Sequence, residues 1–215
     1  MGSSRARAAL ASGPWLGDTR RIMRQPILLL ATLALAPVAG AQTVVEARYG
    51  AHTEYRFVDL SHTLASGLVL DALYTGVPGL NELYLGAGGQ LHPIKGLTVT
   101  PMAYAVFAKE LHERGVTLGA LIALDLGGFK GAGFAGHFIR VDGDNPDYDF
   151  ADALDLTRAI GKWEAGVSTG FFHQSGEWTW LVGPTVKRND AKGQWAVSAR
   201  FGDDTEVRFL RIFVF

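Results

Sequence analysis

The sequence lacks cysteine, which excludes disulfide bridges and thiolate metal sites. Charged residues make up 19% of the chain, below the roughly 25% of an average soluble domain. The 20 lysines and arginines nearly balance the 21 aspartates and glutamates, so the net charge of −1 gives no electrostatic basis for binding nucleic acid. Beyond residue 41 no apolar run is long enough to predict a transmembrane helix.

A short apolar run lies near the N-terminus. Arginines between residues 20 and 24 precede the run from Ile27 to Ala36, and the small residues Ala39-Gly40-Ala41 follow it. This order is typical of a secretory signal peptide, and the run is shorter than the about 20 residues that a membrane-spanning helix needs. The sequence therefore predicts a non-native upstream extension at 1–22, a signal peptide at 23–41 and one domain at 42–215.

The rest of the chain is predicted to form β-strands joined by tight turns. Trp178, Trp180 and Val182 alternate with Glu177 and Thr179, which is the period of two that a strand shows. Short polar segments that contain glycine, such as QSGE and NDAKG, separate the strands, as hairpins require. No long helical crossover is available, so the sheet is predicted to be antiparallel.

The two faces of these strands indicate a barrel in a membrane. One face is aromatic and aliphatic, and the other combines charged residues with many glycines. A transmembrane barrel turns its apolar face to lipid and its polar face to the lumen, whereas a soluble sandwich does the reverse. Trp163, Trp178 and Trp195 lie at strand starts next to turns, where an interfacial aromatic belt belongs. The pattern predicts an all-β, antiparallel, up-and-down transmembrane barrel.

The C-terminal segment EVRFLRIFVF carries a family resemblance. Phe215, Phe213, Phe209 and Val207 occupy alternate positions, from which Arg211 departs. Together with the signal peptide and the alternating strands, this pattern resembles the bacterial outer-membrane β-barrel proteins, whose last strand ends in Phe. The resemblance implies secretion through the inner membrane, contact with outer-membrane lipid and recognition of Phe215 by the barrel-assembly machinery. It leaves the oligomeric state open.

The number of strands is ambiguous. Eleven segments qualify, and a bacterial barrel with both termini at one end needs an even number. The weakest segment is YDFADALDLTRA, whose apolar residues also fit one face of a helix. Dropping it gives ten strands, the favoured count, and keeping it while splitting another segment gives twelve. Pro101 and Pro184 fall inside predicted strands, although proline cannot donate to a strand ladder.

The polar faces carry charges of both signs. A selective pore usually lines itself with one sign, and a mixed set more often pairs across the interior. Ten strands leave little space, since about eight already just fit their side chains. The sequence therefore favours a structural or interaction barrel with a filled or narrowly wet lumen, with a porin-like small-solute channel as the alternative. The residues predicted to face the lumen are Glu46, Arg48, His52, Glu54, Arg56, Glu164, Glu177, Lys187 and Arg200.

One local motif raises an enzymatic alternative. His173, Ser175 and Glu177 in FFHQSGE are residue types that serve as base, nucleophile and orienting acid. The His-x-Ser spacing looks a little like that of the outer-membrane lipid A 3-O-deacylases, but the rest of that family's motif is absent. A polar hairpin turn is the preferred interpretation, and a lipid-modifying enzyme is a second alternative.

No metal or cofactor is predicted. The six histidines form no HxxxH or HExxH pair. The segment DGDNPDYDFAD is rich in carboxylates, which can bind calcium, but its spacing is not that of an EF-hand. A solvated acidic loop is the favoured interpretation for Asp142, Asp144, Asp147, Asp149 and Asp152.

Overall fold

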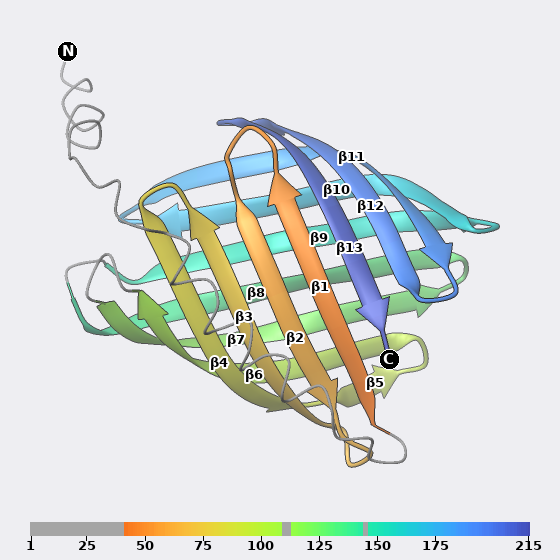
Figure 1. The fold of residues 1–215 in the computed structure, drawn as a ribbon, viewed down its shortest axis with the longest axis horizontal. Helices are drawn as coiled ribbons and strands as arrows, with labels where there is room; N and C mark the ends of the chain where they lie inside the picture. The colour runs from red at the N-terminus through yellow and green to blue at the C-terminus, as the bar shows by residue number, and fades with distance from the viewer. Residues whose placement is uncertain (1–40, 109–112, 144–145) are drawn as a thin grey trace. The chain divides into compact units, whose positions relative to one another are not determined.

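The computed structural model describes residues 41–108, 113–143 and 146–215, which form one antiparallel sheet (Figure 1). The predicted extension at 1–22 and all but the last residue of the predicted signal peptide lie outside the described residues. In the described ranges, no helix has the length and apolarity to cross a membrane. The strands are β1 (Gln42–Gly50), β2 (Arg56–Thr63), β3 (Leu68–Val77), β4 (Leu80–Gly89), β5 (Leu91–Ile94), β6 (Leu97–Ala108), β7 (Glu113–Leu126), β8 (Phe129–Asp142), β9 (Tyr148–Ile160), β10 (Trp163–Gln174), β11 (Glu177–Asp190), β12 (Gly193–Gly202) and β13 (Thr205–Val214).

The sheet closes on itself. β1 pairs with both β2 and β13, and β4 pairs with β6, so twelve strands form an up-and-down barrel while the short β5 pairs with β6 alone. The pairing extends to the last residue. The Phe215 N–H donates to the Thr43 carbonyl oxygen at 2.9 Å, and the Thr43 N–H donates to the Phe215 carbonyl oxygen at 3.2 Å. Closure removes the open sheet edge that lipid does not tolerate.

The favoured count of ten strands was wrong, and the alternative of twelve is confirmed. One of the eleven segments that qualify as strands covers residues 44–58, and it includes most of β1 and the start of β2. A turn separates them, in which the Gly50 N–H donates to the Tyr55 carbonyl at 2.8 Å and Glu54 has a φ of 52°. Polar residues at 52, 54 and 56 continue in the same phase as Glu46 and Arg48, so the alternation alone shows no break.

The segment with helix-like spacing is strand β9, which contains a bulge. Ala153 has a φ of 49°, and the register of β9 shifts against β8 and β10 near this position. A bulge inserts one extra residue and so reverses which alternate residues face inward. The apolar residues on either side of it therefore recur at three- and four-residue spacing, which also fits a helix.

The two strand prolines lie where neighbouring ladders are interrupted. Pro101 falls between Met102, the last β6 partner of β4, and Val99, which pairs with β5. Pro184 pairs with β10, but the pairs between β11 and β12 leave out Gly183 and Pro184. Because the ladders are already interrupted at these places, the missing proline N–H costs the sheet few hydrogen bonds.

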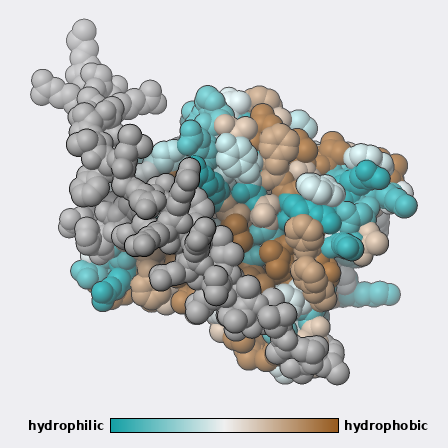
Figure 2. Space-filling model, viewed as in Figure 1, coloured by the Kyte–Doolittle hydropathy of each residue, from teal (hydrophilic) through white to brown (hydrophobic). Residues whose placement is uncertain are grey.

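The barrel has an inverted surface. Large apolar side chains face outward and are exposed, whereas many polar ones are buried inside, including Thr117, Thr185, Arg200 and Glu206 at 0–1% exposure. Figure 2 shows that apolar residues, in brown, cover a large share of the visible barrel surface. Monomeric soluble proteins rarely expose continuous apolar surface on this scale. A transmembrane barrel does so because its outer face contacts lipid.

Aromatic side chains gather near both ends of the outer face. We call the end that holds Gln42 and Phe215 the terminal end, and the other the opposite end. The exposed aromatic residues at the terminal end are Phe129, Trp163, Trp195, Phe213 and Phe215. Those toward the opposite end are Tyr49, Phe107, Trp178, Trp180, Phe201 and Phe209, the last of which is directly opposite Tyr49. Two such belts match the two interfaces of a bilayer.

Depth in the membrane is tested by two substitutions on one strand. Trp178 and Val182 both face outward from β11, and each is 51% exposed. An arginine on the lipid face costs roughly 2–4 kcal/mol near the midplane and about 0–1 kcal/mol at an interface. We therefore expect Val182→Arg to reduce the free energy of unfolding from lipid vesicles more than Trp178→Arg. Equal losses would contradict the depth assigned to these residues.

Candidate functional site

The interior of the barrel is divided into an apolar part and a charged part. The apolar part, which we call the aromatic cluster, consists of aromatic rings and aliphatic side chains from β3, β4, β6, β8 and β9 that pack against one another. Phe138 stacks on Tyr148 with ring centroids 4.6 Å apart, and Tyr104 meets Phe134 edge to face at 5.6 Å. These side chains fill one side of the lumen. The Tyr84 and Tyr148 hydroxyls reach Glu82, which is the polar partner that a buried tyrosine requires.

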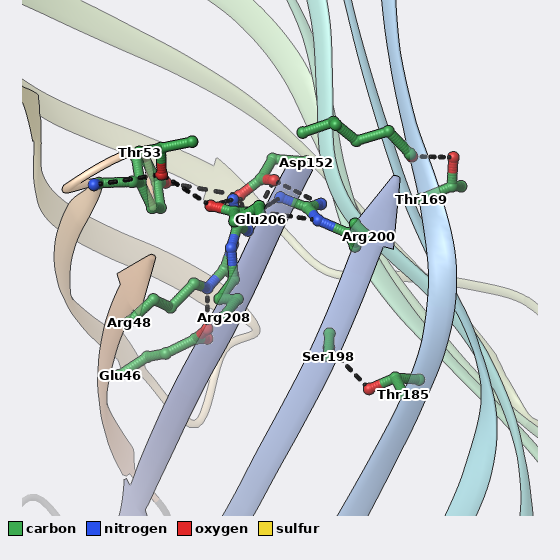
Figure 3. Close-up of polar contacts among 12 residues, drawn as sticks. Glu46, Arg48, Thr53, Asp152, Thr169, Thr185, Ser198, Arg200, Glu206 and Arg208 are labelled. Carbon is green, nitrogen blue, oxygen red and sulfur yellow. Dashed lines mark hydrogen bonds and ion pairs between the residues drawn. The ribbon is translucent and has the colours of Figure 1, made fainter. Parts of the chain in front are cut away.

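The charged part centres on Asp152 (Figure 3). Its carboxylate accepts hydrogen bonds from three arginines: from Arg48 Nη1 at 2.6 Å, from Arg200 Nη1 at 3.2 Å, and from Arg208 Nη1 at 2.7 Å to each oxygen. Glu206 accepts from Arg200 Nε at 2.9 Å and from Arg208 Nη2 at 3.2 Å. Arg48 also pairs with Glu46. We call these six residues the arginine cluster.

Asp152 crosses the lumen to make these contacts. It lies on β9, whereas the arginines lie on β1, β12 and β13. Strands β10 and β11 separate β9 from β12 in the sheet, and further strands separate it from β13 and β1. The ion pairs therefore join facing walls rather than neighbouring strands, and they lie toward the opposite end of the barrel.

Local backbone features make room for this bridge. Asp152 immediately precedes the bulge at Ala153, and bulges are known to re-aim side chains. Gly170 on β10 faces the cluster, and a Cβ there would lie 3.1 Å from Arg200 Nη1. Gly50 also leaves room for the cluster, since a Cβ at this position would lie 2.6 Å from Glu206 Oε1. Side chains at these two glycines would crowd the charged groups.

The charges of the arginine cluster balance. Three arginines face three carboxylates, and the side chains of Arg48, Arg200 and Arg208 are only 2–11% exposed. Burying an unpaired charge is costly, so this degree of burial depends on complete pairing. Aromatic rings add to it: the Arg48 guanidinium lies 4.2 Å from the Phe57 ring centroid, and that of Arg208 lies 4.5 Å from Tyr55.

A second set of polar contacts lies nearer the terminal end. Lys187 Nζ is 2.7 Å from Asp155 Oδ2, with both side chains 7% exposed. Glu164 accepts hydrogen bonds from the Thr157 hydroxyl at 2.9 Å and from Asn189 Nδ2 at 2.8 Å. These groups line the wall without crossing to the facing strands.

A cavity of about 730 Å³ lies inside the barrel. Its walls include arginine-cluster residues, the acidic side chains Asp59 and Asp71 on β2 and β3, and edges of the aromatic cluster. Oδ1 of each of these aspartates is buried without a hydrogen-bond partner among the described residues. The lumen is therefore narrowed and partly filled, but it contains polar space.

The residues predicted to face the lumen divide into two groups. Glu46, Arg48, Lys187 and Arg200 line the cavity, and Glu164 is buried with the partners given above. His52 and Glu54 instead lie in the β1–β2 turn with side chains 71% and 57% exposed, and Arg56 begins β2 at 55%. The prediction for these three differs from the structure because the turn reverses the chain, so that odd-numbered residues face inward on β2. Glu177 is exposed beside the β10–β11 turn.

The residues of the enzymatic alternative are not assembled into a catalytic group. His173 Nδ1 lies 3.2 Å from Asp149 Oδ2, and its ring stacks on Trp178 on the outer face. Ser175 occupies the β10–β11 turn with a φ of 54°. Within the described residues, no contact joins His173 to Ser175 or Glu177, so a nucleophile and its base are not paired.

The acidic segment is dispersed. Asp142 and Asp147 accept backbone N–H groups near the β8–β9 turn, Asp149 lies between His137 and His173, and Asp152 enters the lumen. Asp144 lies outside the described residues. In the part of the chain that the structure describes, no group of three or more His, Asp or Glu residues is arranged to hold a metal ion.

Three residues of the arginine cluster were missed by the sequence reasoning. Asp152 was assigned to a solvated loop because the bulge after it cannot be recognised from alternation. Glu206 and Arg208 had a usable signal, since they share the parity of Leu210 and Ile212, which line the cavity. Counting back from Phe215 in steps of two gives the odd-numbered outer face, which leaves Glu206 and Arg208 on the inner face.

Comparison with known proteins agrees on the fold. No protein-family model matches the chain, and no curated protein matches it. Among solved structures, a KdgM porin is similar with a TM-score of 0.60 and 8% identity, over 81% of this chain and 99% of that chain. The same values hold for the KdgM porin in complex with disordered oligogalacturonate. The NanC porin has a TM-score of 0.57 and 10% identity, over 80% of this chain and 98% of that chain. The chain thus has the fold of the bacterial outer-membrane β-barrels.

The role of Asp152 in stability is open to direct measurement. Asp152→Asn removes one charge from a balanced and buried cluster, and breaking such a pair costs about 3 kcal/mol. Asp190→Asn is the matched control, because Asp190 pairs with Arg211 at 2.7 Å on the outer surface, where a pair is worth about 0–1 kcal/mol. We expect the first variant to lose clearly more unfolding free energy in urea titrations from lipid vesicles. Similar losses in both would show that the cluster is not buried as described.

Proposed function

We propose that this protein is an outer-membrane channel for small hydrophilic solutes. One observation carries the proposal: a cavity of about 730 Å³ with charged walls lies inside a closed barrel whose outer surface is apolar. Such a barrel separates a polar interior from lipid, which is what passage of a hydrophilic solute requires. The porin names of the similar structures support the same function.

The location is part of this proposal. The two aromatic belts support a membrane-spanning orientation, and the closed pairing of β1 with β13 satisfies the backbone in lipid. Both barrel termini lie at one end, which corresponds to the periplasmic side in bacterial outer-membrane barrels. Secretion by the signal peptide at 23–41, and recognition of Phe215 during assembly, remain predictions.

The arginine cluster is proposed to be the constriction. It joins facing walls of the lumen, and the aromatic cluster occupies the remaining side, so a solute must pass beside both. One similar structure is that of the KdgM porin in complex with disordered oligogalacturonate, which is an acidic sugar chain. In the present chain the arginines are already paired with carboxylates, so we propose that neutral and zwitterionic solutes pass as readily as small anions.

The channel fits better than the structural role that the sequence favoured. The aromatic cluster does fill part of the lumen, as expected for a filled barrel, but the cavity leaves polar space beside it. The similar folds with TM-scores above 0.5 include porins. A lipid-modifying activity has less support, because His173 and Ser175 are not in contact.

Swelling of protein-containing liposomes in isotonic sugar tests the channel. We expect entry of hexose-sized neutral sugars and exclusion of large dextrans. Ser61→Trp adds a large side chain at the cavity wall and should slow swelling severalfold. Ala47→Trp adds the same side chain on the outer face of β1 and should leave the rate unchanged. Swelling no faster than in protein-free liposomes would contradict the channel.

A further inference from the structure

Basic and aromatic residues alternate along one row of the outer face at the terminal end. Trp163 on β10 is directly opposite Arg188 on β11, Arg188 is opposite Trp195 on β12, and Trp195 is opposite Arg211 on β13. We call these four residues the basic-aromatic row. The row follows from cross-strand register, so four neighbouring strands present these side chains next to one another on the outer face.

The side chains of the basic-aromatic row contact one another but stay accessible. The Arg188 guanidinium lies 5.5 Å from the Trp163 ring centroid, and that of Arg211 lies 4.7 Å from Trp195. Trp163 and Trp195 are 52% and 56% exposed. Both tryptophans belong to the terminal-end aromatic belt, so the guanidinium groups lie at the depth of lipid headgroups.

The two arginines of the row differ in their ionic partners. Arg211 is neutralised by Asp190, whose oxygens lie at 2.7 and 3.3 Å. The Arg188 guanidinium is exposed, and in the described part of the chain it makes no hydrogen bond or ion pair. Arg158, above the Phe129 ring at 5.9 Å, is also exposed, and Lys162 and Lys192 lie in adjacent turns. This side of the terminal end therefore carries excess positive charge.

Apolar side chains continue from the row toward the middle of the barrel. Val167, Val186 and Val197 face outward on β10, β11 and β12 and are 46–49% exposed. A cationic group between two indole rings, next to a strip of valines, matches a molecule with an anionic head and apolar chains. The planar guanidinium suits a phosphate in particular, because its donors are arranged to bind two oxygens.

We propose that the basic-aromatic row binds an anionic glycerophospholipid. The phosphodiester lies against Arg188 between Trp163 and Trp195, and the acyl chains lie along the valines. Arg211 keeps its pair with Asp190 and holds Trp195 in place from the other side. This inference rests on the membrane location proposed above but not on the channel activity, so the two fail separately.

Native mass spectrometry of the detergent-purified barrel tests the proposal. Phosphatidylglycerol and phosphatidylcholine of equal chain length are added together, and the ratio of bound lipids is measured. We expect the wild type to prefer phosphatidylglycerol and Arg188→Gln to reduce this preference about fivefold, as expected for one basic residue near anionic headgroups. Arg188→Lys should retain most of it.

The matched control is Arg56→Gln, which removes an exposed arginine at the opposite end. It should leave the lipid preference unchanged. Heat-dependent gel migration identifies folded barrels, so that only folded variants are compared. Equal binding of both lipids by the wild type, or an unchanged preference in folded Arg188→Gln, would overturn the proposal. An equal loss in Arg56→Gln would also overturn it, because net charge rather than the row would then explain the binding.

Discussion

The ion pairs between Asp152 and three arginines are the interaction on which the interior of this barrel depends. Asp152 approaches from β9, and Arg48, Arg200 and Arg208 approach from the facing wall. Burying any one of these charges alone would carry a large desolvation cost, which its oppositely charged partners offset. The same contacts narrow the lumen, so the charged groups that stabilise one another also limit the space inside the barrel.

Closure of the sheet makes this interior possible. Because β1 pairs with β13 up to Phe215, each of the twelve barrel strands has two neighbours and the barrel has a separate inside and outside. Large apolar side chains then face outward, and the inward-facing residues of the arginine cluster share a small volume in which they pair with one another. Arg211, which departs from the apolar pattern of the last strand, is accommodated outside by Asp190 and by the rings of Trp195 and Phe213.

Local alternation was enough to predict much of the fold, because it records which face of each strand is apolar. It indicated the all-β class, the antiparallel barrel, the outward tryptophans and the participation of the last strand. It could not show the β1–β2 turn, because polar residues continue in phase through Ala51–Thr53. It also could not place Asp152, since the bulge at Ala153 depends on the register with β8 and β10, which is set by residues distant in sequence.

Asp152 is expected to neutralise the arginines of the proposed constriction. Single-channel recording in a planar bilayer under a salt gradient tests it, because the reversal potential reports the ratio of anion to cation permeability. The account predicts weak selectivity for the wild type, a clear shift toward anions for Asp152→Asn and little change for the outer-surface variant Asp190→Asn. The same reversal potential in Asp152→Asn and the wild type would contradict the claim.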